Sequence, residues 1–281
     1  DLNMNNEQKA AIEQIINSSL DQAEAHWRNG GYKIALEMRK SHAQDSRDFA
    51  INESLMPGLP PIYEGQTIIG EFIALVADMR DSTNHLLQAI SPKKADISDL
   101  QRVFYETSAL LPSLAKVVSF HDGKTTEYLG DGILAFFLVD EEDKTDAMYR
   151  ARRAANDIIG ELRPLLNRII FERYRLPEID LGVGMGISKA IVSLVGLPKE
   201  RQVKAFGECV FRATKLSSGR NEICVDTNLH AQWPTSKNGT LRFRLKSFGS
   251  GDKAVSGYLL EPVSLYTSDA ADDLTRVDLG S

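Results

Sequence analysis

The residues best suited to chemistry in this sequence are two aspartates, Asp78 and Asp131. Asp78 ends the apolar run TIIGEFIALVADM, which is typical of a buried strand, and Asp131 lies in the Gly-Asp-Gly turn between two further strand-like segments. We expect that strand and that hairpin to lie side by side in one sheet, so that the two carboxylates meet. Paired carboxylates suit Mg²⁺ or Mn²⁺, which prefer oxygen ligands and bind substrate phosphates with them.

The residues that follow Asp78 add groups to this site. The backbone carbonyl of Met79 is expected to be a third metal ligand. Arg80, Ser82 and Thr83 open a predicted helix, whose first N–H groups and partial positive charge suit a phosphate. Each feature alone also has an ordinary explanation, because an aspartate at a strand end is usually a cap and Gly-Asp-Gly is usually only a turn. Their combination favours a site where metal and triphosphate bind together.

The segments around the aspartates predict alternating strands and helices. The expected elements are a strand in TIIGEFIALVADM, a helix over residues 97–119, a hairpin in KTTEYLGDGILAFFLV, a helix over 143–174, two strands in DLGVGMGIS and KAIVSLVG, and a short helix over 208–218. This order is the split βαββαβ layout of a ferredoxin-like α+β fold with helices on one face of the sheet.

Further elements are expected at both ends of the chain. Helical spacing predicts an amphipathic helix over residues 6–29 and a charged helix over 33–49, and MPGLPPIYEG reads as an irregular linker. ICVD, LRFRLKSF and GYLLEP are expected as added edge strands. We therefore expect an N-terminal helical extension over 1–65, a catalytic domain over 66–265 and a polar tail over 266–281. The extension is expected to pack on the catalytic domain or on a sister subunit.

Composition narrows the possible partners and surroundings. Across 281 residues the formal net charge is -6, which argues against nucleic acid or an anionic membrane surface as the main partner. The longest apolar run, GILAFFLV, is too short to span a membrane, and the start of the sequence does not read as a secretion signal. A cytoplasmic protein is expected. Cys209 and Cys224 then act as reduced packing residues.

Four segments resemble class III adenylyl and guanylyl cyclases. FIALVADMRDST and EYLGDGILAFF resemble the two metal-binding segments of that family, GVGMGISKAIVSLVG its paired strands, and KAFGECVFRATKLSS its catalytic turn and helix. The resemblance covers residues 72–260. It implies a ferredoxin-like cyclase domain in which Asp78 and Asp131 hold two divalent cations, Mn²⁺ or Mg²⁺. These ions activate the ribose 3'-hydroxyl and hold the triphosphate while pyrophosphate leaves.

Several positions depart from the family pattern. Where those cyclases carry an Asn that orients ribose and an Arg that stabilises charge on phosphate, this chain has Phe211 and Lys215. Lys keeps the charge without the two-pronged geometry of Arg, and Phe donates no hydrogen bond, which leaves Arg212 as a substitute. Lys246 resembles a triphosphate-binding Lys, although Lys253 lies nearby.

The residues that resemble the base-reading pair are Glu127 and Lys204. Adenylyl cyclases carry Lys and guanylyl cyclases Glu at the first place, and Asp or Cys is usual at the second. A carboxylate beside an ammonium suits N3–H and O4 of uracil, or N1–H and O6 of guanine. Cytosine is a less natural fit, and adenine fits worst.

These departures resemble the bacterial pyrimidine cyclases of Pycsar antiphage systems. The resemblance implies that UTP is converted to cyclic UMP, with CTP as the alternative, and that the product acts on a separate effector protein. It also implies a head-to-tail homodimer, in which Asp78 and Asp131 of one subunit face Lys204 and Lys215 of the other. Competing interpretations are a degenerate cyclase that binds nucleotide or a partner without turnover, a relative of diguanylate cyclases or polymerase palms that lacks their GGDEF-like turn, and a structural scaffold.

Overall fold

The computed structural model describes residues 3–30, 56–59, 62–63, 65–82, 97–197, 201–235, 239, 241–249, 254–262 and 276–277. The expected helix over 33–49 lies outside these residues. Within them, no helix is both long and apolar enough to cross a membrane.

The centre of the molecule is a mixed sheet whose first four strands have the expected ferredoxin-like order. These strands are β1 (Thr67–Met79), β2 (Lys124–Tyr128), β3 (Gly132–Leu138) and β4 (Leu181–Val195), and they lie in the order β2-β3-β1-β4. β1 pairs antiparallel with both neighbours, and Asp78 stands opposite Gly132 of β3 and Gly182 of β4. The βαββαβ prediction is confirmed, and the hairpin turn falls where Gly-Asp-Gly indicates.

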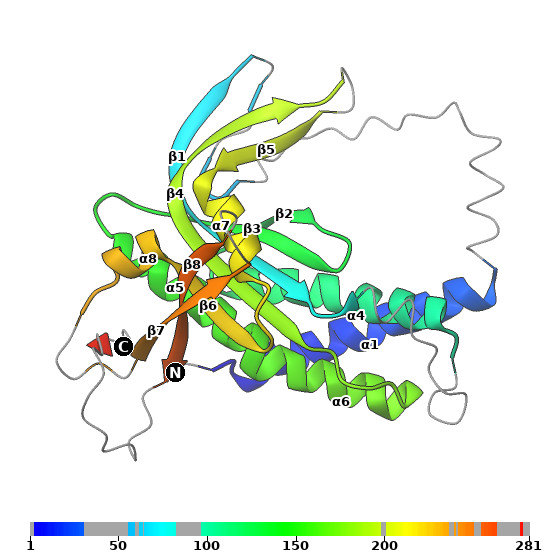
Figure 1. Cartoon of the computed structure of the whole chain (residues 1–281). Helices are drawn as coiled ribbons and strands as arrows, with labels where there is room; N and C mark the ends of the chain where they lie inside the picture. The colour runs from blue at the N-terminus through cyan, green and yellow to red at the C-terminus, as the bar shows by residue number, and fades with distance from the viewer. Residues whose placement is uncertain are drawn as a thin grey trace, which may run out of the picture.

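The strands after the second helical segment differ from the prediction. DLGVGMGIS and KAIVSLVG form one continuous strand, β4, because no turn residue interrupts them and the pairing with β1 runs unbroken from Thr67 to Met79. β5 (Gln202–Gly207) was not expected and pairs with the far half of β4. Figure 1 shows β1, β4 and β5 rising together as an arm beyond the helices.

The remaining strands extend the sheet past β4. They are β6 (Glu222–Asp226), β7 (Leu241–Phe248), β8 (Val255–Pro262) and β9 (Arg276–Val277), in the order β4-β6-β8-β7-β9. The expectation of edge strands is wrong for β6 and β8, since β6 pairs parallel to β4 and β8 lies between β6 and β7. β9 falls in the segment expected to be a tail.

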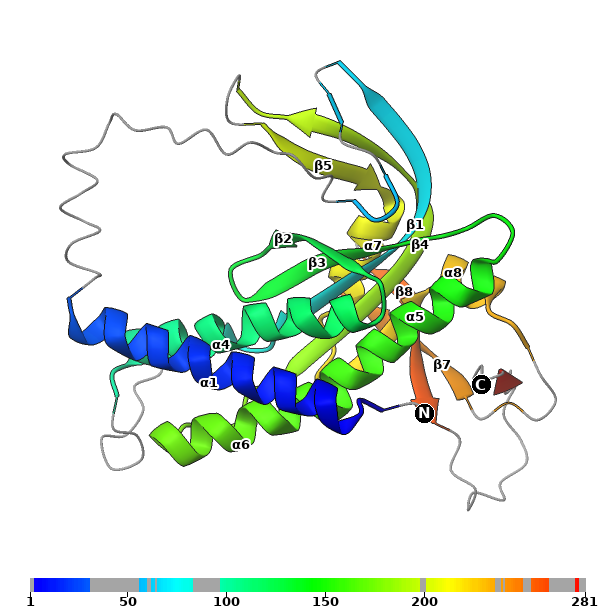
Figure 2. The same cartoon turned by 180° about the vertical axis from the view of Figure 1, so that it is seen from behind.

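Helices cover one face of the sheet, as Figure 2 shows. They are α1 (Asn6–Arg28), α4 (Asp99–Phe120), α5 (Lys144–Asp157), the π-helical turn η1 (Ile158–Leu162) and α6 (Arg163–Tyr174). Asn5 and Ser98 start α1 and α4 with capping boxes, in which side chain and backbone exchange hydrogen bonds. The predicted helix over 143–174 is thus one helical segment with a π-turn in its middle.

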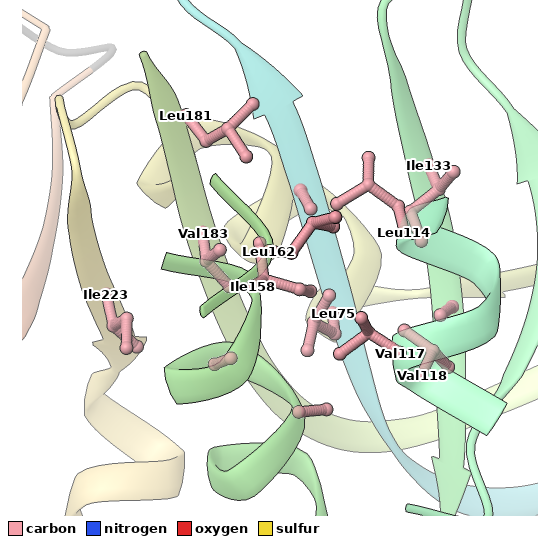
Figure 3. Packing of buried hydrophobic residues seen from close by; sticks show 14 of the residues in the cluster. Leu75, Leu114, Val117, Val118, Ile133, Ile158, Leu162, Leu181, Val183 and Ile223 are labelled. Atoms are coloured by element: carbon pink, nitrogen blue, oxygen red, sulfur yellow. The ribbon is translucent and has the colours of Figure 1, made fainter. Parts of the chain in front are cut away.

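The core between these helices and the sheet joins distant parts of the chain. Leu75 of β1, Leu114 of α4 and Val183 of β4 are fully buried in it (Figure 3). Ile16 of α1 is 0% exposed in the same cluster. The N-terminal helix therefore packs on the helical layer that covers the sheet.

On the opposite face α7 (Glu208–Leu216) lies against β4 and β1, over a second apolar cluster, and α8 (Thr227–Gln232) follows β6. The buried side of α7 is formed by Cys209 and Ala213. Cys209 and Cys224 are both free and buried, as expected.

Candidate active site

Asp78 and Asp131 are brought together by the pairing of β1 with β3. The backbone N–H of Met79 donates to the carbonyl oxygen of Asp131 at 3.0 Å, directly beside the Asp78–Gly132 pair. A side chain at Gly132 would place its Cβ 2.4 Å from the carbonyl oxygen of Ala77, so the hairpin can approach β1 only with glycine there. The convergence expected from strand and hairpin is therefore present.

The two carboxyl groups interact electrostatically. Burial and the neighbouring charge of Asp131 raise the pKa of Asp78 from 3.8 to about 6, while the guanidinium of Arg80 opposes the shift. Arg80 forms an ion pair with Asp78, and the hydroxyl of Ser82 donates to the carboxylate of Asp131. Two acidic groups thus share one partly buried spot, where a divalent cation would relieve their repulsion.

The oxygen atoms present fit a hard divalent cation. No group of three or more His, Cys, Asp or Glu side chains gathers in the part of the chain that the structure describes. Mg²⁺ is commonly held by one or two carboxylates with water and substrate phosphates. Asp78 and Asp131 supply the carboxylates, and the backbone of Met79, at the end of β1, is next to both.

The turn after Met79 directs the chain toward a helix start. Asp81 has a left-handed backbone with φ 59°, and Ser82 begins the next helical segment. Thr83 lies outside the described residues, so its predicted role with phosphate stays a prediction. Arg80 and Ser82 both lie at the carboxylate pair, and their predicted contacts with substrate phosphate stay predictions.

Glu127 and Lys204 form an ion pair within one chain. The Nζ atom of Lys204 lies 2.7 Å from Oε2 of Glu127, and the two side chains are 30% and 24% exposed. An acceptor and a donor thus stand side by side at a half-open position. That arrangement can bind an edge on which a ring N–H adjoins a carbonyl oxygen.

The catalytic-helix candidates lie on α7. Phe211 is 57% exposed, and the Nζ atom of Lys215, one turn further, lies 5.9 Å from the centre of its ring. The Nε atom of Arg212 lies 2.6 Å from Oε1 of Glu208. Phe211, Arg212 and Thr227 help to line an open cavity of about 390 Å³. Phe211 and Lys215 therefore point away from the sheet, where a substrate or second subunit can reach them.

Lys246 of β7 reaches past β8 to a carboxylate on β6. It forms an ion pair with Glu222, and its Nζ atom lies 5.1 Å from the centre of the Phe248 ring. Lys253, the alternative, lies outside the described residues. The predicted contact of Lys246 with triphosphate stays a prediction.

Glycines in β4 position α7, and our sequence analysis did not recognise them. A Cβ at Gly184 would lie 2.0 Å from the carbonyl oxygen of Ala213, and one at Gly182 would lie 2.0 Å from that of Ser217. Side chains at either position would push α7 off the sheet. The alternating pattern GVGMG was the available signal, since glycine inside a strand often marks close backbone approach.

Comparisons with solved structures identify the fold. The guanylyl cyclase Cya2 is 18% identical with a TM-score of 0.52, over 76% of this chain and 98% of that one. The adenylyl cyclase CyaB from P. aeruginosa is 13% identical with a TM-score of 0.55, over 71% and 98%. A class III adenylyl cyclase-like ATP-binding protein from Pseudomonas aeruginosa is 17% identical with a TM-score of 0.53, over 64% and 40%.

These likenesses show that the chain has the fold of class III nucleotide cyclase catalytic domains. No protein-family model and no curated protein matches the sequence.

Proposed function

We propose that the chain is a metal-dependent nucleotide cyclase that converts UTP to 3',5'-cyclic UMP and pyrophosphate. The observation that carries the proposal is the meeting of Asp78 and Asp131 at the junction of β1 and β3, in a class III cyclase fold. The ribose 3'-oxygen bonds to the α-phosphorus, and the bond between the α-phosphorus and the oxygen that bridges to the β-phosphate breaks. Pyrophosphate leaves, and the 3'-hydroxyl proton is lost to solvent.

Asp78, Asp131 and the carbonyl of Met79 would hold two divalent cations, Mn²⁺ or Mg²⁺. Bound there, such ions activate the 3'-hydroxyl and neutralise the triphosphate. The N–H groups of Asp81 and Ser82 would face phosphate, and Arg80 adds a positive charge beside them. A cation held by Asp78 would compete with Arg80 for this carboxylate, and the guanidinium of Arg80, once released, could bind the triphosphate.

The positive groups for the developing charge are on α7. Lys215 has the family position for this task, with Arg212 as the nearest alternative once it leaves Glu208. Phe211 cannot orient ribose by a hydrogen bond, so its exposed ring would contact the sugar or base by packing.

Base choice is proposed to depend on the Glu127–Lys204 pair. Glu127 would accept N3–H of uracil while Lys204 donates to O4, using two atoms that already lie side by side. CTP is the next candidate, followed by GTP, whose N1–H and O6 form a related edge, and ATP.

We propose a head-to-tail homodimer with two shared sites. In this arrangement Asp78 and Asp131 of one subunit face Lys204 and Lys215 of the other. Glu127 would then join Lys204 on the base-reading side, since the two pair within one chain. The resemblance to pyrimidine cyclases further supports a cytoplasmic second-messenger role in antiphage defence, with cyclic UMP acting on a separate effector.

A nucleotide-binding module without turnover is the second candidate. Phe211 at the place of a ribose-orienting Asn favours it, and one solved structure with this fold is described as an ATP-binding protein. The two functions differ in pyrophosphate release, which binding alone does not produce.

The test is mass spectrometry of products after incubation with all four nucleoside triphosphates and Mn²⁺. We expect cyclic UMP as the main product, together with pyrophosphate, and no product from Asp131→Asn. Cyclic CMP or a cyclic purine nucleotide would correct the base. Binding of a triphosphate with no product from any of the four would instead support the binding module.

A further inference from the structure

An arginine outside the proposed chemistry joins the metal-side turn to the end of α7. The guanidinium of Arg220 forms ion pairs with two carboxylates, those of Asp81 and Asp180. Asp81 follows β1 in the turn beside the carboxylate pair, and Asp180 directly precedes β4. One side chain therefore connects three segments that are distant in sequence.

The turn at Asp81 needs a restraint. Its φ of 59° is a left-handed conformation that residues other than glycine rarely adopt, although aspartate tolerates it better than most. This conformation lies between Met79, at the end of β1, and Ser82, which begins the next helical segment and donates to Asp131. The direction of the Ser82 N–H group therefore depends on keeping Asp81 left-handed.

The other end of the restraint is firmly held. The N–H of Arg80 donates to the carbonyl oxygen of Asp180 at 2.8 Å, and the side-chain amide of Asn221 donates to the Asp180 carboxylate at 2.7 Å. Asn221 also exchanges two backbone-directed hydrogen bonds with Leu181, at 2.6 Å and 3.1 Å. Arg220 thus projects from a turn that is tied to the start of β4.

Close packing adds to this rigidity. A Cβ at Gly182 would meet the carbonyl oxygens of Ser217 and Gly219 at 2.0 Å and 2.3 Å, so the turn after α7 rests directly on the strand backbone. The Arg220 guanidinium therefore links the firmly held turn at Asn221 to the left-handed turn at Asp81.

We propose that Arg220 is a positioning residue, which holds the Arg80–Ser82 turn so that the N–H groups of Asp81 and Ser82 face the substrate triphosphate. This role rests on the proposed function. Arg220 and Asp81 are 55% and 48% exposed, and ion pairs this open contribute little to global stability. The expected effect is therefore on local order and substrate use rather than on unfolding.

Hydrogen exchange of the full-length protein tests the restraint without any substrate. In Arg220→Ala we expect the amides of Met79 and Arg80, which donate to the carbonyl oxygens of Asp131 and Asp180, to exchange about 10-fold faster, since local opening is governed by local contacts. Arg242→Ala, which removes a comparable surface ion pair with Glu261, should leave them unchanged. Unchanged exchange in Arg220→Ala would overturn the proposal.

Steady-state kinetics test the consequence for substrate. We expect Arg220→Ala to lower kcat/KM for UTP about 10-fold, mainly through KM, and Arg220→Lys to recover part of the loss. Asp81→Gly removes both the ion pair and the need for a restraint, so Arg220→Ala in that background should change kcat/KM less than about 2-fold. Equal effects of Arg220→Ala in both backgrounds would contradict the proposal, as would faster exchange with unchanged kinetics.

A binding measurement separates this proposal from the proposed function. Wild-type protein that neither cyclises nor binds a non-cyclisable UTP analogue with Mn²⁺ would disprove the function, whatever the exchange rates show. If the wild type binds the analogue without turnover, Arg220 can still position a bound triphosphate. Arg220→Ala should then raise the Kd for the analogue about 10-fold. An unchanged Kd in that case would overturn the role of Arg220.

Discussion

The ammonium of Lys204 lies 2.7 Å from the carboxylate of Glu127, although their strands are not neighbours in the sheet. β2 and β5 are separated by β3, β1 and β4, so the contact requires the curved arm to bring β5 back toward the hairpin. Such a pair presents one acceptor and one donor in fixed order. The order of acceptor and donor, rather than the charge alone, would decide which base edge binds.

Exchanging the pair for the adenylyl-type residues should change base preference. We expect Glu127→Lys combined with Lys204→Asp to lower kcat/KM for UTP about 10- to 100-fold and to raise that for ATP, because unpaired buried donors reject the wrong edge. Competition among the four triphosphates, followed by mass spectrometry, measures this. The matched control exchanges Glu71 with Lys144, also 2.7 Å apart, and should keep the UTP preference. An unchanged ranking in the Glu127–Lys204 variant would refute base reading by this pair.

Mixing two inactive variants should restore part of the activity. Asp78→Ala lacks the metal side of the site and Lys215→Ala lacks the opposite side, so a mixed dimer regenerates one intact site. With free subunit exchange, about a quarter of wild-type sites should recover. Pyrophosphate release over a titration of one variant into the other gives the measurement. Mixing Asp78→Ala with Asp131→Asn should restore nothing, and no recovery in the first mixture would argue against shared sites.

The pH of the solution should control both metal binding and the stability of the fold through the ionisation of Asp78. Its pKa is raised to about 6, so its ionised form destabilises the fold. The cost is absent below the unfolded value near 3.8, grows as pH rises, and is complete above about 6. Metal-free Asp78→Asn should therefore be more stable than wild type by about 1–2 kcal/mol near neutral pH, and the gain should vanish toward about pH 4.

Mn²⁺ competes with the proton at the same group. It should raise the Tm of the wild type at about pH 7.5, less so below about pH 6, and have no effect on Asp78→Asn. Thermal unfolding at several pH values measures both effects. A gain of stability by Asp78→Asn that does not change with pH would contradict the assignment.

The order of the first elements could be predicted because each boundary has a local chemical cause. Ser98 caps α4, Gly-Asp-Gly makes the hairpin, and Asp78 ends an apolar run, so the convergence of Asp78 and Asp131 followed from neighbouring strands. The local sequence was therefore enough to predict that these two carboxylates meet.

Periodicity alone could not predict contacts that depend on tertiary curvature, and only the family resemblance had paired Glu127 with Lys204. Lys204 reaches Glu127 only because β4 continues unbroken into the arm and carries β5 with it, and the sequence pattern had suggested two separate strands. Arg220 pairs with Asp81 and Asp180, which precede it by 139 and 40 residues, and periodicity carries no information over such separations.

The N-terminal helix should be required for a stable fold. Ile16 of α1 is fully buried in the main core, so Ile16→Ala should lower the free energy of unfolding by about 2–5 kcal/mol. Gln14→Ala, at an exposed position of the same helix, is the control and should have little effect. Urea denaturation of both variants measures the difference. Equal stability would mean that α1 packs too loosely to matter.

Close contact between β4 and α7 predicts a contrast between two glycines. At Gly184 an added methyl group would lie 2.0 Å from the carbonyl oxygen of Ala213, so Gly184→Ala must push α7, and with it Lys215, away from the sheet. At Gly160, inside η1, an added methyl group meets nothing within 4 Å and would favour helix. We expect Gly184→Ala to cost about 1–3 kcal/mol of unfolding free energy, and Gly160→Ala to gain up to about 1 kcal/mol.

Activity separates the packing role of Gly184 from simple instability. At a temperature where Gly184→Ala remains folded by circular dichroism, its kcat should still fall about 10-fold or more, because small displacements of a catalytic group are costly. Gly160→Ala should keep wild-type kcat. Full activity of folded Gly184→Ala would mean that α7 tolerates displacement, and the groups proposed on it, Lys215 and Arg212, would then have no part in the chemistry.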